Sequence, residues 1–242
     1  MEFLELLKTD RPVLLDGGMG TMLQARGLPV GATPELVALE HPDWLRDIHT
    51  AYLDAGSQII YANTFGANRE KLERTGRSVE EIVTAAVAVA KEAATGRGLV
   101  ALDIGPCGQL LEPTGMLGFE DAVDLFAQVV RAGVKAGADL IAIETMTDLQ
   151  EARAALLAAK ENSNLPVLVT MTYEASGRTF LGCSPAAAAL TLEGLGADAV
   201  GVNCSLGPRE MPPLVEELLK WTNLPIVLKP NAGLPHPDGL GL

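Results

Sequence analysis

Cys204 has the most distinctive chemistry among the polar residues that end the apolar runs of this sequence. It follows Asn203 at the end of the run DAVGV and precedes a short turn, Ser205-Leu206-Gly207-Pro208. A thiolate is both a nucleophile and a metal ligand, whereas a buried neutral cysteine behaves as a small apolar side chain. Spacing alone leaves both interpretations open, because the sequence contains no CxxC pair and no HExxH motif.

Two carboxylates, Asp16 and Glu144, also end apolar runs. Such a pair could exchange protons with a substrate, and it could equally hold a substrate ammonium through charge-assisted hydrogen bonds. The three histidines, His41, His49 and His236, lie away from the ends of the runs, and we expect each to be a surface or capping residue. This placement disfavours a Ser-His-Asp mechanism.

Further polar side chains end the remaining runs, and they are Asn63, Thr64, Asp103, Thr170, Thr172, Lys229 and Asn231. If the runs are parallel strands of a barrel, their carboxyl ends converge on one mouth, where the active sites of barrel enzymes lie. Cys107 and Cys183 lie in loops near that mouth. We expect both of them to be ordinary cysteines, because nothing in their surroundings indicates an activated thiol.

Seven short apolar runs alternate with helical patterns along the chain. The runs are rich in Val, Ile and Leu and almost continuously apolar, which is typical of buried parallel strands. They span residues 12–18, 57–65, 99–106, 139–146, 166–173, 198–205 and 225–233. Helices are expected over 35–55 (with an interruption at His41-Pro42), 78–94, 119–136, 148–161, 184–195 and 213–222.

Strands that alternate with helices form a parallel sheet with right-handed crossovers. The pattern therefore predicts an α/β fold, a TIM (β/α)8 barrel, in one domain over residues 1–242. Eight strands close such a barrel and seven are recognised, so we expect the eighth β/α unit to be missing and the domain to be C-terminally incomplete. A doubly wound open sheet is the alternative, although no GxGxxG or Walker sequence follows any run.

The composition fits one large domain, with 48% hydrophobic and 20% charged residues among 242. A net charge of −13 and the lack of a basic stripe argue against nucleic acid and against an anionic membrane surface. Three cysteines make no disulfide framework, the N-terminus is not a signal peptide, and no apolar run is long enough to span a bilayer. We therefore expect a cytoplasmic protein with free thiols.

Seven segments resemble the homocysteine S-methyltransferase family, and within it the homocysteine-binding N-terminal module of the cobalamin-dependent methionine synthases. They occur in the family's order over nearly the whole chain, and DGGMGT, GVNCS and KPNAGLP are together specific. The segments are LLDGGMGTMLQ (14–24), ANTFGANREKL (62–72), ALDIGPCG (101–108), IETMTDLQEARAAL (143–156), TMTYEASGRTFLG (170–182), GVNCSLGP (201–208) and KPNAGLP (229–235).

The resemblance implies a TIM barrel that binds L-homocysteine through Zn²⁺, with Cys204 as the catalytic residue and one metal ligand. Two further cysteine ligands, an adjacent pair in a GGCCG segment, are expected beyond Leu242. A thiol bound to zinc loses its proton and becomes a nucleophile, which can then attack a methyl group to give methionine. The resemblance also implies a set of substrate-binding residues, namely Asp16 and Glu144 for the ammonium, Gly17 and Gly18 for the carboxylate, and Thr64, Asn203 and Asn231 around the site.

The resemblance implies that the methyl donor is carried elsewhere, as methylcobalamin or methyltetrahydrofolate on a corrinoid or folate domain or protein. A donor of the S-methylmethionine or betaine type is the alternative, since the same barrel hosts such enzymes. Two other functions stay open. The chain could be a non-catalytic module that binds an amino acid or a corrinoid protein, or a lyase in which Lys229 forms a Schiff base.

Overall fold

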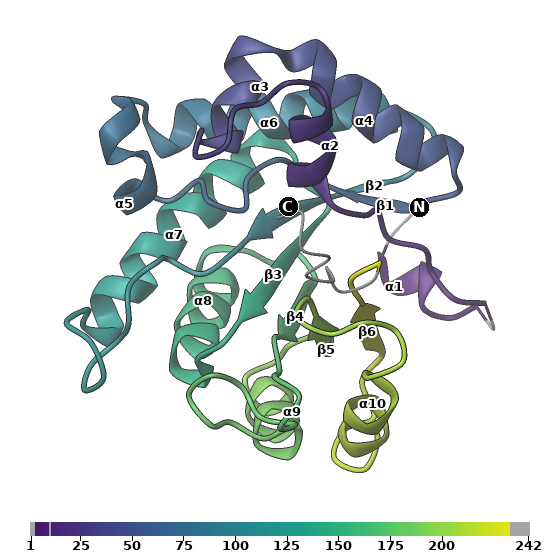
Figure 1. The fold of residues 1–242 in the computed structure, drawn as a ribbon, viewed down its shortest axis with the longest axis vertical. Helices are drawn as coiled ribbons and strands as arrows, with labels where there is room; N and C mark the ends of the chain where they lie inside the picture. The colour runs from purple at the N-terminus through teal and green to yellow at the C-terminus, as the bar shows by residue number, and fades with distance from the viewer. Residues whose placement is uncertain (1–2, 10, 233–242) are drawn as a thin grey trace, which may run out of the picture.

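Within residues 3–9 and 11–232, which the computed structural model describes, six parallel strands form one sheet in sequence order (Figure 1). The strands are β1 (Ile59–Tyr61), β2 (Leu99–Ile104), β3 (Leu140–Met146), β4 (Val167–Met171), β5 (Ala199–Asn203) and β6 (Ile226–Lys229). The sheet curls, and helices connect its strands, as in a TIM-like barrel. The predicted α/β class is confirmed.

The first predicted strand, 12–18, is wrong as a full strand. It forms only an isolated parallel bridge between Leu15 and Ile59, supported by a hydrogen bond from the Asp16 N–H to the Ile59 carbonyl. Pro12 cannot donate to a ladder and Gly17 follows Asp16 directly, so few residues are left to pair. The expected absence of an eighth unit concerns chain outside the described residues and stays a prediction, as does residue 233 of the last predicted strand.

The helices that were predicted form close to their expected bounds, except that the helix predicted over 213–222 already ends at Leu218. His41 separates α3 from α4, and Pro42 occupies the first turn of α4, where its missing N–H costs no helical hydrogen bond. The Ser78 hydroxyl caps α6 by accepting from the Glu81 N–H at 3.1 Å. Four short helices, α1, α2, α5 and η2, were not predicted. The helices are α1 (Phe3–Leu6), α2 (Met19–Ala25), η1 (Pro34–Leu36), α3 (Val37–Glu40), α4 (Pro42–Asp54), α5 (Arg69–Leu72), η2 (Glu73–Thr75), α6 (Val79–Ala94), α7 (Phe119–Ala136), α8 (Leu149–Asn162), α9 (Pro185–Gly194) and α10 (Pro212–Leu218).

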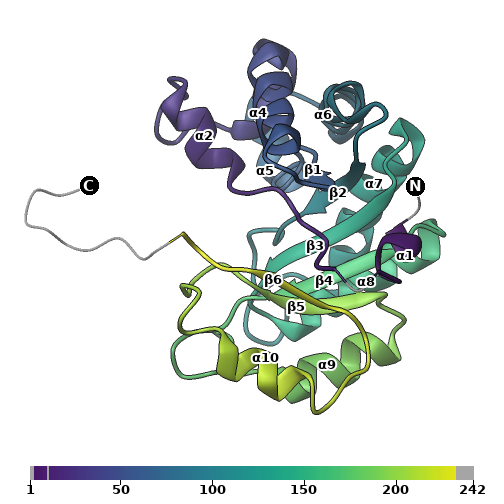
Figure 2. The same cartoon turned by 90° about the vertical axis from the view of Figure 1, so that its right-hand side faces the viewer.

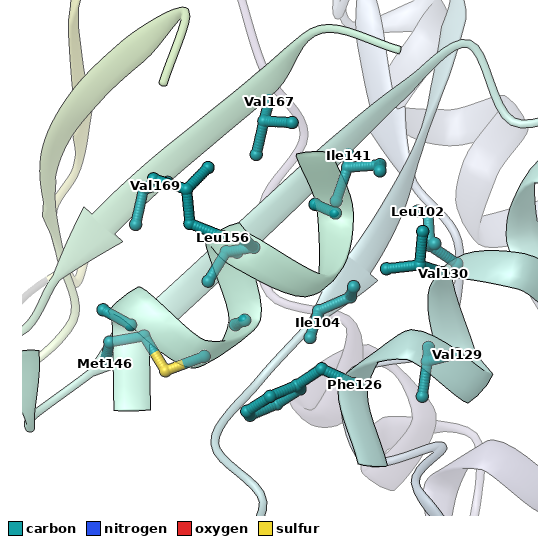
Figure 3. Packing of buried hydrophobic residues seen from close by; sticks show 14 of the residues in the cluster. Leu102, Ile104, Phe126, Val129, Val130, Ile141, Met146, Leu156, Val167 and Val169 are labelled. Carbon is teal, nitrogen blue, oxygen red and sulfur yellow. The ribbon is translucent and has the colours of Figure 1, made fainter. Parts of the chain in front are cut away.

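The outer face of the sheet carries the larger apolar cluster. There, strand residues such as Leu102, Ile141 and Val169 pack against Phe126 of α7 and Leu156 of α8 (Figure 3). Helices α9 and α10 cover β5 on the same side (Figure 2). None of the helices in the described ranges combines the length and the apolar character that crossing a membrane requires.

The inner face carries a second apolar cluster, because successive strand residues point to opposite sides of a sheet. Its strand members are Ile59, Tyr61, Leu99, Ala101, Leu140, Ala142, Leu168 and Ala199. Phe3 and Leu6 of α1 pack against them. Both faces of the sheet are therefore buried, as continuously apolar parallel strands predict.

The prediction for His49 is wrong, because this side chain is fully buried on α4 rather than exposed or capping. Helical spacing places it on the same face as Leu45, Ile48 and Leu53. Neither ring nitrogen has a hydrogen-bond partner among the described residues, and burial lowers the pKa of His49 to about 4. His41 is exposed beside the start of α4, as predicted, and His236 lies outside the described residues.

We expect His49 to make the protein less stable as the pH falls from 6.5 toward about 4. The unfolded chain protonates this imidazole near its ordinary pKa, whereas the folded protein keeps it neutral, so the unfolded state binds more protons in that window. The loss is on the order of 3 kcal/mol. Urea unfolding of the wild type and of His49→Leu at both ends of the window measures it. A stability difference between the two proteins that does not change with pH would contradict the prediction.

Candidate functional site

The inner face of the sheet changes from apolar to polar at the carboxyl ends of its strands. Asp103 on β2, Glu144 on β3 and Asn203 on β5 continue the inward-pointing positions, and Lys229 on β6 is the register partner of Asn203. Asp16 reaches the same place from the segment beside β1. These five side chains line one cavity of about 860 Å³. The structure therefore brings strand-end polar residues together, as a barrel mouth requires.

The Lys229 ammonium is the centre of this polar cluster. Its Nζ lies 3.2 Å from Glu144 Oε2 and 3.8 Å from Asp16 Oδ1, and it stands 3.6 Å from the centre of the Tyr61 ring. Burial alone would favour the neutral amine, but Glu144, Asp16 and Asp103 outweigh it and raise the pKa of Lys229. A lysine held protonated is a poor nucleophile, which disfavours the Schiff-base alternative.

Asp16 is buried, and only one of its two carboxylate oxygens has a hydrogen-bond partner among the described residues. Its Oδ2 accepts a hydrogen bond from the Tyr61 N–H at 2.7 Å, whereas Oδ1 has no hydrogen-bond partner among the described residues. Burial raises the pKa of Asp16 to about 7, although the charge of Lys229 works in the opposite direction. A cationic group placed beside Oδ1 would favour the ionised carboxylate.

Asp103 and Glu35 also line the cavity, and sequence reasoning gave neither of them a role. Burial and the nearby Glu144 raise the pKa of Asp103 well above its ordinary value, which favours the neutral carboxyl, a form that can donate a hydrogen bond. Glu35 Oε1 accepts from the Gly66 N–H at 2.7 Å. The sequence pattern did place Asp103 at the mouth without a role, whereas no local signal marks Glu35.

The Asn203 amide holds the backbone around Cys204. Its Oδ1 accepts from the Thr145 N–H and from the Thr170 hydroxyl, both at 2.9 Å. Its Nδ2 donates to Thr145 Oγ1 at 2.7 Å and to Cys204 Sγ at 3.4 Å. Thr145, Cys204 and Ser205 adopt φ values of 64°, 59° and 54°, which are unfavourable for residues with a side chain. Strain of this kind persists where surrounding contacts enforce it, and it concentrates at functional sites.

Cys204 alone does not make a metal site. Burial raises the pKa of its thiol, and the Thr145 hydroxyl only partly offsets that effect. A catalytic zinc ordinarily has three protein ligands, and no group of three His, Cys, Asp or Glu residues converges in the part of the chain that the structure describes. The described residues therefore do not fit zinc by themselves. Cys107 and Cys183 belong to the outer apolar cluster and its margin, in agreement with their prediction as ordinary cysteines.

The remaining predicted residues divide into two groups. Gly17, Gly18 and Asn231 line the cavity. Thr64 is not among the lining residues: it lies behind them, where its hydroxyl donates to the Asp103 carbonyl at 2.8 Å and accepts from the Asp103 N–H at 3.1 Å. Thr64 thus joins the end of β1 to β2.

Comparisons with known proteins place this geometry in context. A family model described as homocysteine S-methyltransferase matches residues 13–240. Methionine synthase of Mycobacterium tuberculosis is 30% identical over 246 residues, covering 94% of this chain and 21% of that protein. Methionine synthase of Mycobacterium leprae is 31% identical over 252 residues, covering 96% and 21%. The chain thus spans about a fifth of the length of these curated relatives.

Solved structures share the fold. The metallated form of the homocysteine methyltransferase MmuM from Escherichia coli superposes with a TM-score of 0.84 at 24% identity, covering 96% of this chain and 87% of that chain. An apo form of the same protein superposes with a TM-score of 0.77 at 26% identity, covering 94% and 84%. The curled sheet of this chain therefore has the arrangement found in a homocysteine methyltransferase.

We expect Asn203→Ala to lower the free energy of unfolding by about 1–3 kcal/mol, because the Thr145 N–H and the Thr170 hydroxyl lose their acceptor in a buried place. Asn162→Ala is the matched control, since that amide accepts from Arg131 near the surface at 3.0 Å. The control should cost less than about 1 kcal/mol. Urea unfolding of both variants gives the comparison, and equal losses would contradict a special role for Asn203.

Proposed function

Because this chain belongs to the homocysteine S-methyltransferase family, we propose that it transfers a methyl group to the sulfur of L-homocysteine and yields methionine. The observation that carries the proposal is the convergence of two acids, Asp16 and Glu144, with the thiol of Cys204 on one cavity. The names of the mycobacterial relatives support the product, and the name of the Escherichia coli relative supports the substrate.

In this proposal the acids hold the amino-acid head group of the substrate. Asp16 and Glu144 accept from its ammonium, and the backbone at Gly17 and Gly18 faces its carboxylate. The unpartnered Oδ1 of Asp16 supports this arrangement, since it is a buried acceptor on the cavity wall. A bound ammonium would satisfy that oxygen and stabilise its ionised form. Asn203 and Asn231 line the same cavity and shape the site around the substrate.

The sulfur of homocysteine is proposed to lie toward Cys204. Cys204 is proposed as one zinc ligand, and the metallated form of the Escherichia coli relative supports a metal in this fold. The described residues provide one of the three ligands that a catalytic zinc ordinarily has, so the others would come from outside the described ranges. The particular contribution of Cys204 is a thiol in a fixed place, because strained backbone and the Asn203 amide hold it at the mouth of the cavity.

The overall change forms one sulfur–carbon bond and breaks the bond between the methyl group and its donor, and the thiol proton is released. The donor is proposed to be methylcobalamin or methyltetrahydrofolate on another module. The much greater length of the mycobacterial relatives supports this, because it leaves room for such modules. A donor of the S-methylmethionine or betaine type is the alternative. Offering the protein each donor with homocysteine and measuring methionine tests the proposal, and a protein that binds homocysteine but forms no methionine would be the non-catalytic module.

Asp16→Asn should weaken homocysteine binding by about tenfold or more, because the amide cannot offer a negative charge to the ammonium. The same change should raise stability near pH 8 by on the order of 4 kcal/mol. The folded carboxyl titrates at about 7 and the unfolded one at 3.8, so the wild type loses stability as the pH rises through this interval. Calorimetry and urea unfolding measure the two effects.

Asp47→Asn is the matched control for that substitution, since Asp47 is exposed and pairs with Arg26 at 3.0 Å. We expect it to leave homocysteine binding unchanged. Undiminished homocysteine binding by Asp16→Asn would sink the proposed role of this acid.

The zinc proposal predicts one zinc ion per full-length protein, with Cys204→Ala losing both the metal and methionine formation. Cys183→Ala should lose neither, because Cys183 belongs to the margin of the outer apolar cluster. Metal content can be measured by atomic absorption and methionine by chromatography. Full zinc occupancy in Cys204→Ala would show that this thiol is not a ligand.

A further inference from the structure

Among the residues that the structure describes, one cation lies at the polar end of the cavity, and the proposed methyl transfer leaves it without a role. Among the described residues that line the cavity, only Lys229 and Arg11 are positively charged. Arg11 precedes Asp16 by five positions in a segment that runs parallel to β1, so it belongs to the opposite end of the cavity. Lys229 is therefore the positively charged residue, among those described, that a ligand at the mouth would contact.

The Lys229 ammonium occupies the place where a ligand ammonium would bind. It pairs with Glu144 at 3.2 Å and approaches Asp16 at 3.8 Å, and these are the acids proposed for the substrate. It also covers the Tyr61 ring, whose face favours a cation. In the free protein Lys229 thus acts as a tethered counter-ion for the two acids, since buried carboxylates without a counter-charge are strongly disfavoured.

We propose that Lys229 recognises the α-carboxylate of the bound substrate and thereby restricts the site to zwitterionic amino acids. This inference rests on the proposed function. When the substrate ammonium pairs with Glu144 and Asp16, the Lys229 ammonium is released from them. The substrate carries its carboxylate on the same carbon atom as its ammonium, so the released charge is close to a new partner. The flexible stem of lysine permits this movement with no change of backbone.

Charge balance makes the exchange selective. A zwitterion adds no net charge to the site, and each of its charged groups finds a partner of opposite sign. Without Lys229, the substrate carboxylate would keep only the backbone at Gly17 and Gly18 as a partner. It would lie near Asp16 and Glu144 with no cation among the described lining residues at that end. An amine that lacks the carboxylate would gain nothing from Lys229. The side chain therefore contributes to the affinity of one ligand class and not of the other.

The experiment compares L-homocysteine with 3-aminopropane-1-thiol, which lacks only the carboxylate. Calorimetry of the wild-type chain should show homocysteine binding about tenfold or more tighter than the amine. Lys229→Met should reduce this ratio several-fold, through weaker binding of homocysteine and not of the amine. Lys229→Arg keeps the charge and should keep the preference. Lys229→Gln repeats the neutral variant if the methionine variant does not unfold cooperatively.

Lys220→Met is the matched control, because Lys220 is an exposed lysine that pairs with Glu217 at 2.8 Å away from the cavity. It should retain the wild-type ratio. A wild-type ratio near one, or neutral Lys229 variants that lose both ligands by the same factor, would overturn the role of Lys229 and leave the proposed function standing. A wild-type chain that binds neither ligand would overturn the proposed function, and this inference with it.

Discussion

Charge removed from water needs a partner, and this requirement organises the open end of the barrel-like sheet. Asp16, Glu144 and Asp103 lie together at the end of an otherwise apolar interior, and the Lys229 ammonium is placed among them. Even so, burial raises the pKa of Asp16 and of Asp103, so the cluster is short of positive charge. A ligand that brings an ammonium supplies what the protein lacks. The same imbalance that costs stability in the free protein thus favours binding of an amino acid.

The backbone around Cys204 is also held in an unfavourable conformation, which costs stability. Three features occur together there. They are a register irregularity in β3, positive φ values at Thr145 and Cys204, and a hydrogen bond through which the Asn203 amide joins β5 to β3. Each departs from the regular sheet below it, where inward and outward residues simply alternate. The rigid part of the fold therefore carries an irregular edge on which the thiol and the acids are presented.

Fold alone does not identify a reaction, because unrelated enzymes share barrels of this type. The carboxyl transferase domain of Rhizobium etli pyruvate carboxylase, for example, superposes on this chain with a TM-score of 0.56 at 19% identity. The family match over residues 13–240 and the residues at the strand ends are what support the proposed methyl transfer onto a thiol. The proposed selection of the substrate by charge depends on Lys229.

The sequence by itself determined the elements whose signal is local and repeated. Continuous apolar runs located β2 to β6, and helical spacing with Ser78 as a cap located α6, because each depends on neighbours along the chain. Tertiary structure decided the rest. The side chain of His49 is buried because the face of α4 that carries it packs inward. The first predicted strand, 12–18, forms a single bridge instead of a ladder of hydrogen bonds. The pairing of Lys229 with Asp16, the raised pKa of Asp103 and the backbone at Cys204 arise from contacts between segments far apart in sequence, which no local pattern encodes.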